Sequence, residues 1–328
     1  MRTEAIFRAL ADPTRLRMMR LLGTMELAVG ELAQVLGQSQ PRVSRHVGIL
    51  CDAGLTQRRR EGSWTFLRSA DGVSGGQSAF EAELIGLLAT AEKTDGDFAA
   101  ACQADRRKLA EIRAARDAQA EAYFAQHARD WDELRRMHSS DDEVEAALID
   151  ALGEGGLGRL LDIGTGTGRM AELFARRADH IVALDKSLPM LRIARAKLQH
   201  LAADRIEVLQ GDFTQLPFAD DGFDTVLFHQ VLHFAPSPAT PLQEAARVTR
   251  PGGRIAIVDF APHAHEELRD KHAHTRLGFA DAQMRELLDE AGFVSTQTVS
   301  LDDGELGIRI WVAHRRPVPD THAQRNAA

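Results

Sequence analysis

From Gly158 onward the sequence alternates between short apolar strands and helical segments, and this alternation constrains the fold more than any other feature. Strand-helix units repeated in this way favour a parallel, doubly wound sheet that binds ligands at the carboxyl ends of its strands. We therefore expect an α/β Rossmann-like domain in this part of the chain. Its predicted strands are residues 159–163, 180–185, 206–210, 223–228, 254–260, 294–300 and 307–313.

The rest of the chain has a different pattern. The first 70 residues indicate short helices and a small hairpin, and the pattern is then helical to about residue 137. A length of 328 residues suits about two domains. The predicted fold class is thus a multidomain chain, with an α-rich helix-turn-helix, a helical connector and the α/β domain. The predicted boundaries are residues 1–78 for the helix-turn-helix domain, 79–137 for the helical connector, 138–316 for the α/β domain and 317–328 for a disordered tail.

Two predicted helices, 30–36 and 39–50, are separated by Gly37 and Gln38, which is the spacing of a helix-turn-helix. In the second helix Val43, Val47 and Leu50 form an inward stripe, and the polar residues remain on the outer face. Such side chains reach base edges and phosphates from the major groove. The predicted DNA-binding residues are Ser39, which we expect to cap this helix, Gln40, Arg42, Ser44, Arg45 and His46, together with Arg58, Arg59 and Arg60 on the hairpin.

Charge supports this interpretation. Residues 1–68 contain eleven Arg, no Lys and six acidic residues, a net charge of +5. Because the whole chain has a net charge of −8, the remaining residues carry −13. A basic N-terminal part joined to an acidic remainder indicates that only the first part binds a polyanion.

The N-terminal residues resemble the ArsR family of winged helix-turn-helix repressors. The resemblance rests on residues 10–17, 39–46 and 50–55. It implies a homodimer that binds an inverted-repeat operator, with the helices flanking the winged core at the interface. Metalloid sensors of the family carry two cysteines at the start of the motif, where this chain has Glu26-Leu27-Ala28-Val29-Gly30. We therefore expect no metalloid sensing there, since a soft-metal site needs thiolates.

A glycine-rich turn follows the first predicted strand of the α/β domain, in the tract 160–168. Glycines at this bend let a ligand approach the backbone, and Asp185 at the end of the next strand is placed to bind ribose hydroxyls. Gly166, Gly168 and Ala171 also satisfy a loose dinucleotide pattern, so the turn alone leaves the ligand open.

Three further features narrow the choice: Asp162 before the first glycine, the tract 211–213 after the third strand, and the tract 251–253 before the fifth. Together they resemble class I S-adenosylmethionine-dependent methyltransferases over about residues 120–315. The resemblance implies that the cofactor is S-adenosylmethionine or S-adenosylhomocysteine. The candidate cofactor-binding residues are Tyr123, Asp162, Gly164, Thr165, Gly166, Gly168, Asp185, Lys186, Met190, Gly211, Asp212, Phe213, His229 and Gln230.

Several residues have more than one interpretation. Tyr123 is the only tyrosine and either lines the pocket or belongs to the core. His229 and His233 are weak candidates for a catalytic base, because a lone histidine near a strand end is more often structural. Arg276 is a candidate to bind a carboxylate with two hydrogen bonds. The four histidines His263, His265, His272 and His274 lack a thiolate and fit no closed zinc site, so we expect no metal.

Two functional classes follow. In the first, the chain is a transcriptional regulator whose methyltransferase-like domain binds its nucleoside ligand as an effector, as in related regulators that respond to S-adenosylhomocysteine and control methionine-cycle genes. In the second, the domain is an active methyltransferase of a small acceptor and the DNA-binding domain is autoregulatory. Arsenite is not an expected acceptor, because no cysteine follows Cys102.

The cellular setting can also be anticipated. No stretch approaches the roughly 18 consecutive apolar residues of a membrane span, and the first residues lack a secretory apolar region. Two cysteines are too few for a disulfide framework. We expect a cytoplasmic protein whose partners are double-stranded DNA and a small nucleoside ligand, with no membrane partner.

Overall fold

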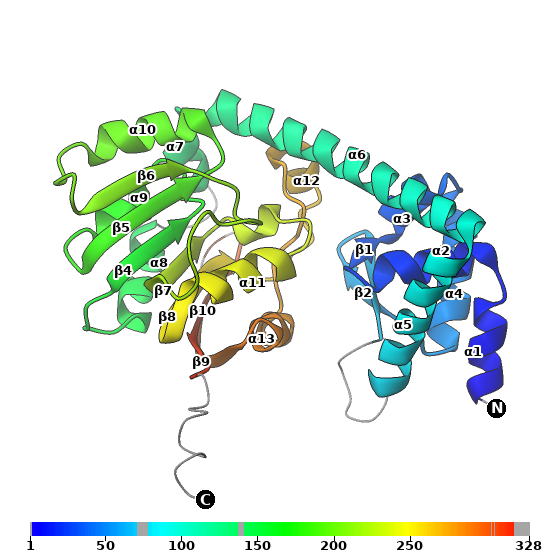
Figure 1. The fold of residues 1–328 in the computed structure, drawn as a ribbon. Coiled ribbons are helices and arrows are strands. Elements are labelled where there is room, and N and C mark those ends of the chain that lie inside the picture. The colour runs from blue at the N-terminus through cyan, green and yellow to red at the C-terminus, as the bar shows by residue number, and fades with distance from the viewer. Residues whose placement is uncertain (1, 71–77, 137–140, 303, 305, 318–328) are drawn as a thin grey trace, which may run out of the picture. The chain divides into compact units, whose positions relative to one another are not determined.

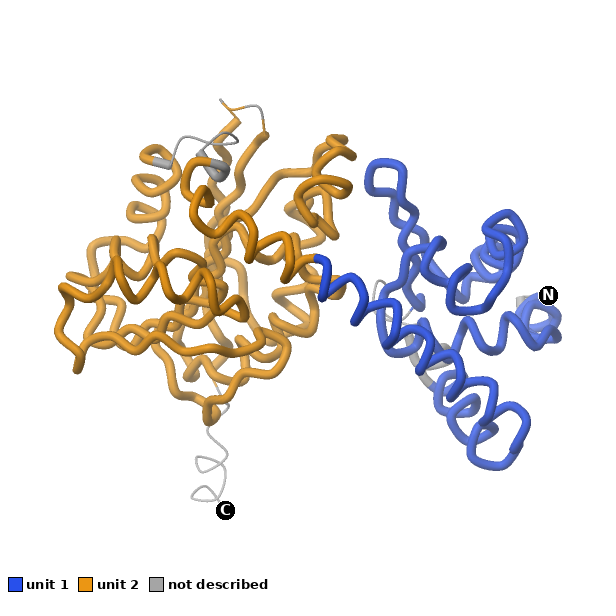
Figure 2. The backbone as a smooth tube through the Cα atoms, turned by 90° about the horizontal axis from the view of Figure 1, so that it is seen from above, with its two compact units in different colours: residues 1–119 blue, residues 120–328 orange. Residues whose placement is uncertain are grey.

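The computed structural model describes residues 2–70, 78–136, 141–302, 304 and 306–317. It divides into two compact units, residues 1–119 and 120–328, which Figure 2 distinguishes by colour. The boundary falls within one helix, α6 (Gly96–His127). The predicted domain boundaries at residues 78 and 137 stay a prediction. Each unit is described separately below.

The first unit is helical with a small antiparallel sheet of strand order β1-β3-β2. The other elements of this unit are α1 (Arg2–Leu10), α2 (Pro13–Leu22), β1 (Leu27–Ala28), α3 (Val29–Leu36), α4 (Gln40–Asp52), β2 (Thr56–Glu61), β3 (Trp64–Ser69) and α5 (Ser78–Thr94).

Local signals set the helix ends in this unit. The Asp12 carboxylate accepts hydrogen bonds from the backbone N–H groups of Thr14 at 2.8 Å and Arg15 at 3.2 Å, so it caps α2. Gly37 ends α3 in the left-handed conformation, with φ of 61°. Because these signals lie in the sequence itself, the helix-turn-helix could be located before the structure was known.

Helices α5 and α6 pack on this unit. Leu88 of α5 and Leu109 of α6 are buried in the same apolar cluster as the helix-turn-helix core. In addition, Arg17 of α2 donates from Nε to the buried Asp105 of α6 at 2.7 Å. The first part of the predicted connector therefore completes the core of the first unit.

The second unit is built on a seven-stranded sheet of order β6-β5-β4-β7-β8-β10-β9, in which β10 runs antiparallel to both of its neighbours (Figure 1). Its elements are α7 (Trp131–Arg136), α8 (Asp141–Ala151), β4 (Gly158–Ile163), α9 (Arg169–Phe174), β5 (Ala178–Asp185), α10 (Leu188–Leu198), β6 (Ile206–Gln210), β7 (Phe223–His229), the 3₁₀ turn η1 (Leu232–Phe234), α11 (Ala239–Val248), β8 (Thr249–Phe260), α12 (Glu267–His272), α13 (Asp281–Glu290), β9 (Phe293–Leu301) and β10 (Ile308–Arg315).

All seven predicted strands are present, and the multidomain fold class with a Rossmann-like α/β domain is confirmed. The main difference is β8, which begins at Thr249 instead of Arg254, because Thr249 pairs with Phe223 before a shift of register. Two apolar clusters pack in this unit, one including Leu148 of α8 and the other Leu242 of α11. They bury helices against the sheet, as a doubly wound fold requires.

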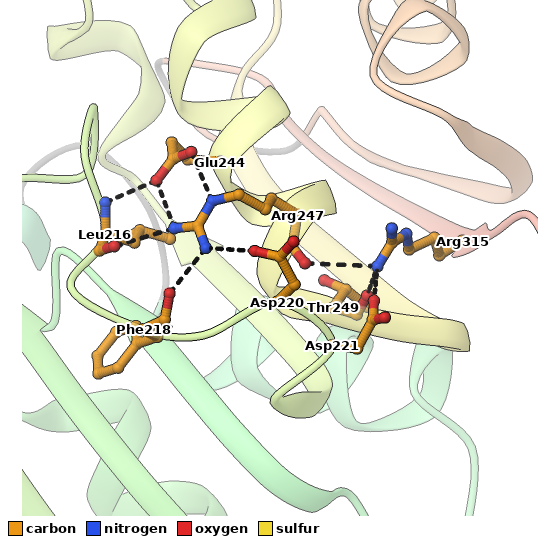
Figure 3. A network of polar contacts seen from close by, with 8 residues as sticks. All are labelled: Leu216, Phe218, Asp220, Asp221, Glu244, Arg247, Thr249 and Arg315. Carbon is orange, nitrogen blue, oxygen red and sulfur yellow. Dashed lines mark hydrogen bonds and ion pairs between the residues drawn. The ribbon is translucent and has the colours of Figure 1, made fainter.

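A polar network fastens the loop between β6 and β7 (Figure 3). The Arg247 guanidinium binds both oxygens of Glu244 at 2.8 Å and donates to the carbonyls of Leu216 at 2.9 Å and Phe218 at 2.7 Å. The hydrogen bond from Arg247 is the main reason why the pKa of Glu244 is lowered. Arg315 of β10 joins the network at the carbonyl of Thr249. Hydrogen bonds from Arg247 thus hold the loop between β6 and β7.

Among the described residues, no helix is both long and apolar enough to cross a membrane.

Candidate functional site

Helix α4 presents a polar face to solvent. Val43, Val47 and Leu50 are buried, as the predicted inward stripe requires. The predicted DNA-binding residues Gln40, Arg42, Ser44 and Arg45 are all exposed. An exposed row of amide, hydroxyl and guanidinium groups on one helix has the chemistry that reads base edges and phosphates.

Two predicted residues of α4 lie differently. Ser39 occupies the N-cap position, yet its side chain makes no capping hydrogen bond. The side chain of His46 is only 12% exposed, and its Nδ1 lies 3.4 Å from Arg15 Nη1 and 3.8 Å from Asp12. Our placement of His46 on the outer face is therefore wrong, because the ring turns toward the capped start of α2.

The three arginines of the hairpin do not act together. Arg58 and Arg60 are exposed, whereas Arg59 points to the other face of β2, as side chains alternate along a strand. Arg59 binds Glu26 at 3.0 Å and Glu61 at 2.8 Å and lies 4.9 Å from the Phe66 ring centre. Burial opposes its charge, but the two carboxylates outweigh burial and raise the pKa of Arg59. Arg59 therefore fastens the hairpin.

In the second unit the glycine-rich turn follows β4. Gly164, Gly166 and Gly168 all have positive φ, at 70°, 56° and 86°, which favours glycine. A Cβ at Gly164 would lie 2.4 Å from Val231, whereas one at Gly166 would meet only Trp131 at 3.6 Å or beyond. The Thr165 hydroxyl donates to Asp162 at 2.6 Å. Asp162 is 1% exposed and therefore holds the glycine-rich turn from its buried side.

Asp185 ends β5 beside this turn. Its carboxylate accepts hydrogen bonds from the backbone N–H groups of Gly166 at 2.9 Å and Ser187 at 2.8 Å. Burial raises the pKa of Asp185 in spite of these hydrogen bonds, which favour the charged form. A carboxylate has four lone-pair positions, so this one is oriented by backbone and retains capacity for ligand hydroxyls.

The other predicted cofactor-binding residues near β5 and β6 differ in their charge contacts and in their burial. Lys186 lies 3.6 Å from Asp212 and 3.0 Å from Glu121. Burial pushes the pKa of Asp212 up, but hydrogen bonds from Thr214 and the Lys186 ammonium outweigh it, so the pKa is lowered. The remaining three differ in burial: Gly211 and Phe213 are half-buried beside Asp212, whereas Met190 is 2% exposed within α10.

The segment before the sheet contributes a group of aromatic residues. Phe124 packs against Trp131 at 5.4 Å and against Phe234 at 4.9 Å between ring centres. Tyr123 hydrogen-bonds His272 Nδ1 at 2.7 Å, and its burial raises the pKa of the phenol. The aromatic side chain of Trp131 also faces Gly166.

A polar bridge fastens the same segment to the turn. The Thr167 hydroxyl donates to Asp132 at 2.6 Å, and Lys197 binds the other oxygen of Asp132 at 2.9 Å. The sequence assigned no role of its own to Thr167, although Thr167 lies in the tract 160–168, and Asp132 belongs to no motif.

The carboxyl ends of β4 and β7 lie next to each other, where the strand order reverses. His229 ends β7, and Gln230 follows it with φ of 52°, a left-handed conformation that is rare outside glycine and clusters at functional sites. Ligands of doubly wound sheets bind at such a reversal. The glycine turn, Asp185, His229 and Gln230 therefore lie on one edge of the sheet.

His233, the other candidate for a catalytic base, is held by a buried carboxylate. The His233 Nδ1 lies 2.8 Å from Asp259 Oδ1, and the backbone N–H of His233 donates to the second oxygen at 3.1 Å. His233 and Asp259 are 2% and 0% exposed. An acidic residue within the otherwise apolar end of β8 was the signal that could have identified Asp259 beforehand.

Of the four histidines in the later loop, His263 and His265 lie 5.6 Å apart between ring centres, and three of the four have separate partners. His272 bonds Tyr123, His265 binds Glu267 at 2.9 Å, and His274 packs against His233 at 4.2 Å between ring centres. In the described part of the chain, no group of three or more His, Cys, Asp or Glu residues is placed to hold a metal ion. Arg276 is fully buried and donates to the carbonyl of Pro236 at 2.7 Å, and its role in binding a carboxylate stays a prediction.

Comparison with known families bears on both units. Residues 12–57 match the family model of bacterial regulatory proteins of the arsR family, and residues 161–257 match a methyltransferase domain. The chain therefore joins a segment similar to the arsR-family regulatory proteins to a segment similar to a methyltransferase domain.

Relatives match the methyltransferase part. The demethylmenaquinone methyltransferase of Clavibacter sepedonicus is 41% identical over 103 residues, which are 31% of this chain and 41% of that protein. The arsenite methyltransferase of Halobacterium salinarum is 29% identical over 165 residues, which are 48% of this chain and 42% of that protein. This chain spans less than half the length of either relative. The cysteine argument against arsenite as acceptor stays a prediction.

A solved structure supports the fold. A chain of the Haloferax volcanii complex between the Trm112 methyltransferase activator and a methyltransferase aligns with a TM-score of 0.50 and 23% identity, covering 59% of this chain and 97% of that one. At this identity the likeness concerns the fold alone.

Proposed function

We propose that this chain is a DNA-binding transcriptional regulator whose methyltransferase domain binds S-adenosylmethionine or S-adenosylhomocysteine as an effector. The observation that carries the proposal is the pairing of Gly166 with Asp185 at 2.9 Å, in a chain that also exposes a recognition helix. This pairing sets a carboxylate beside a turn that admits close ligand approach, which suits a ribose diol.

The residues that would hold the ligand fit it chemically. The Asp162–Gly168 turn would receive the methionine part, Asp185 the ribose, and Asp212 with Phe213 the adenine. S-adenosylmethionine, when bound, supplies a methyl group on a sulfonium. Of the other candidates, Lys186 orients Asp212, and Tyr123 belongs to the aromatic segment before the sheet. The buried Met190 supports α10.

The regulator would act as a homodimer on an inverted repeat and control genes of the methionine cycle. Two apolar side chains support a protein interface: Phe7 on α1 is 58% exposed and Leu87 on α5 is 59% exposed, on helices that flank the winged core. In the proposed homodimer, both side chains would be buried at the interface. A cytoplasmic location follows from the DNA partner.

An effector changes DNA binding only through different affinities for the DNA-competent and DNA-incompetent states. Binding free energies are reciprocal, so operator DNA would change the affinity for the nucleoside by the same factor.

The test of this proposal separates the two units. Arg45→Ala should weaken operator binding about 100-fold, because one good base contact contributes about 1–3 kcal/mol. Its affinity for S-adenosylhomocysteine should match that of the wild type. Arg192→Ala, which removes an exposed arginine of α10, is the matched control and should change neither affinity. Loss of both affinities in Arg45→Ala would contradict the placement of the DNA-binding face.

One observation favours a second candidate function, methyl transfer to a small acceptor. Asp259 would hold His233 as the Nδ1–H tautomer, leaving Nε2 to take a proton from an acceptor O–H or N–H as the methyl group leaves the sulfonium. S-adenosylhomocysteine and the methylated acceptor would be the products. His229, which ends the neighbouring strand, would contact the ligand.

This second function has its own assay. Wild-type protein, methyl-labelled S-adenosylmethionine and the small-molecule fraction of a cell extract should yield a labelled product. Asp259→Asn should reduce labelling and shift its pH profile while S-adenosylmethionine affinity stays unchanged. Labelling that is equal in the two proteins would rule out His233 as the base.

A further inference from the structure

A polar groove of about 490 Å³ lies in the first unit between α3, α4 and the β2–β3 hairpin. Gln40 and Ser44 of α4 form one wall, and Arg58 and Trp64 of the hairpin form another. Arg116 of α6 also lines this groove, although α6 belongs neither to the helix-turn-helix nor to the hairpin. We refer to this cavity as the α4–hairpin groove.

Arg116 is held in the groove by two contacts. Its Nη1 donates to Glu31 Oε1 at 2.8 Å, and its guanidinium carbon lies 5.7 Å from the Trp64 ring centre. Glu31 is 5% exposed and also has Arg113 Nε at 3.9 Å, so two guanidinium groups face one carboxylate. This cluster keeps a net positive charge. The Arg116 side chain remains 31% exposed.

The hairpin contributes a second cation to the lining, Arg58. Arg58 is exposed, and its Nη2 would lie 3.5 Å from a Cβ at Gly48 of α4, so its guanidinium lies along the recognition helix. Hydroxyl groups of Ser44, Ser63 and Thr65 complete the lining. Two arginines and three hydroxyl groups in one groove form a lining that suits a phosphodiester.

We propose that Arg116 contacts a DNA backbone phosphate in the α4–hairpin groove, so that α6 is a third DNA-binding element beside the recognition helix and the hairpin. The inference rests on the DNA-binding function proposed above. The ion pair engages Nη1, and a guanidinium has five N–H donors, so one side chain can bind Glu31 and a phosphate together. The contact with Trp64 orients the guanidinium plane.

The contact would also bear on regulation. Helix α6 continues beyond Arg116 to His127 and includes Tyr123, which hydrogen-bonds His272 in the second unit. A DNA-contacting residue and a candidate ligand-site residue thus belong to one helix.

The test is the salt dependence of operator binding by the full chain. The slope of log K against log salt should fall in magnitude in Arg116→Ala by about 0.9 for each subunit of the bound homodimer, the value for one lost phosphate contact per subunit. Arg107→Ala, at an exposed position of the same helix, is the matched control and should keep the wild-type slope. Arg116→Lys should also retain the slope, since it keeps the charge.

The outcomes are distinguishable. A slope in Arg116→Ala equal to that in Arg107→Ala would overturn the proposal, as would tighter operator binding, which would mean that Arg116 blocks the groove. Weaker binding with an unchanged slope would assign Arg116 a structural role and would also overturn it. Failure of the wild type to bind DNA would instead contradict the proposed function itself.

Discussion

Helix α4 exposes its polar side chains to solvent, whereas the carboxylates at the edge of the seven-stranded sheet accept hydrogen bonds from loops at that edge. Arg42 and Arg45 are exposed on α4. By contrast, Asp162 accepts from Thr165 at 2.6 Å, Asp185 from Gly166 at 2.9 Å and Asp212 from Thr214 at 2.8 Å. A DNA interface is wet and its contacts form on binding, while a small-ligand site is largely formed in advance.

The same contrast occurs within a single strand. Arg58 and Arg60 of β2 are exposed, and Arg59 between them is held by Glu26 and Glu61. Neighbouring arginines of one strand thus differ in role: Arg58 and Arg60 are exposed to solvent, whereas Arg59 stabilises the hairpin. The difference between exposed and held polar groups can be tested by mutation.

The largest effect is expected at the glycine turn. Gly164→Ala combines a positive φ with a Cβ 2.4 Å from Val231, and should lower the free energy of unfolding of the second unit by about 3 kcal/mol. Gly153→Ala is the control, because Gly153 has φ of 68° but no atom within 4 Å of its Cβ. It should cost about 1 kcal/mol. Equal losses in thermal unfolding would mean that the turn tolerates a side chain.

A smaller effect is expected on the hairpin. Arg59→Ala leaves the buried Glu61 and half-buried Glu26 without this cation and should lower the free energy of unfolding by about 2 kcal/mol. Arg60→Ala should leave stability within about 0.5 kcal/mol of the wild type and weaken operator binding. Denaturant titration measures the stability of both variants, and DNA titration measures their operator affinity. Weaker operator binding with unchanged stability in Arg59→Ala would show that Arg59 faces the DNA.

The smallest effect is expected at Asp185. Asp185→Asn should weaken S-adenosylhomocysteine binding about tenfold at neutral pH, because a charged hydrogen-bond acceptor is lost. The carboxyl has a pKa raised above 3.8 by burial, so the wild-type affinity should fall as the pH drops through that raised pKa. Calorimetric titrations over this range should show no such fall in Asp185→Asn. A fall in both proteins would assign the pH dependence to another group.

Much of this architecture could be predicted from the sequence. The strands were located because apolar runs bounded by turn residues carry a local signal, and Gly37 and Asp12 fixed helix ends in the same way. The inward stripe of α4 followed from helical spacing. These features depend on residues close together in the chain, which is why the sequence reveals them.

The remaining features depend on residues that are far apart in sequence. His46 turns inward because Asp12 and Arg15, about thirty residues earlier, receive it. Arg59 is held by Glu26, and Asp259 meets His233 across two elements. Periodicity shows which face a residue occupies, but it does not show which distant group will bind it.

The central claim, that nucleoside binding controls DNA binding, is tested most directly by fluorescence anisotropy. Labelled DNA from upstream of the gene is titrated with the purified protein at fixed salt, alone, with S-adenosylmethionine and with S-adenosylhomocysteine. We predict that one of the two ligands changes the operator affinity at least fivefold and the other does not, which suits a coupling free energy of about 1 kcal/mol or more. Tight DNA binding with the same affinity in all three titrations would contradict the account.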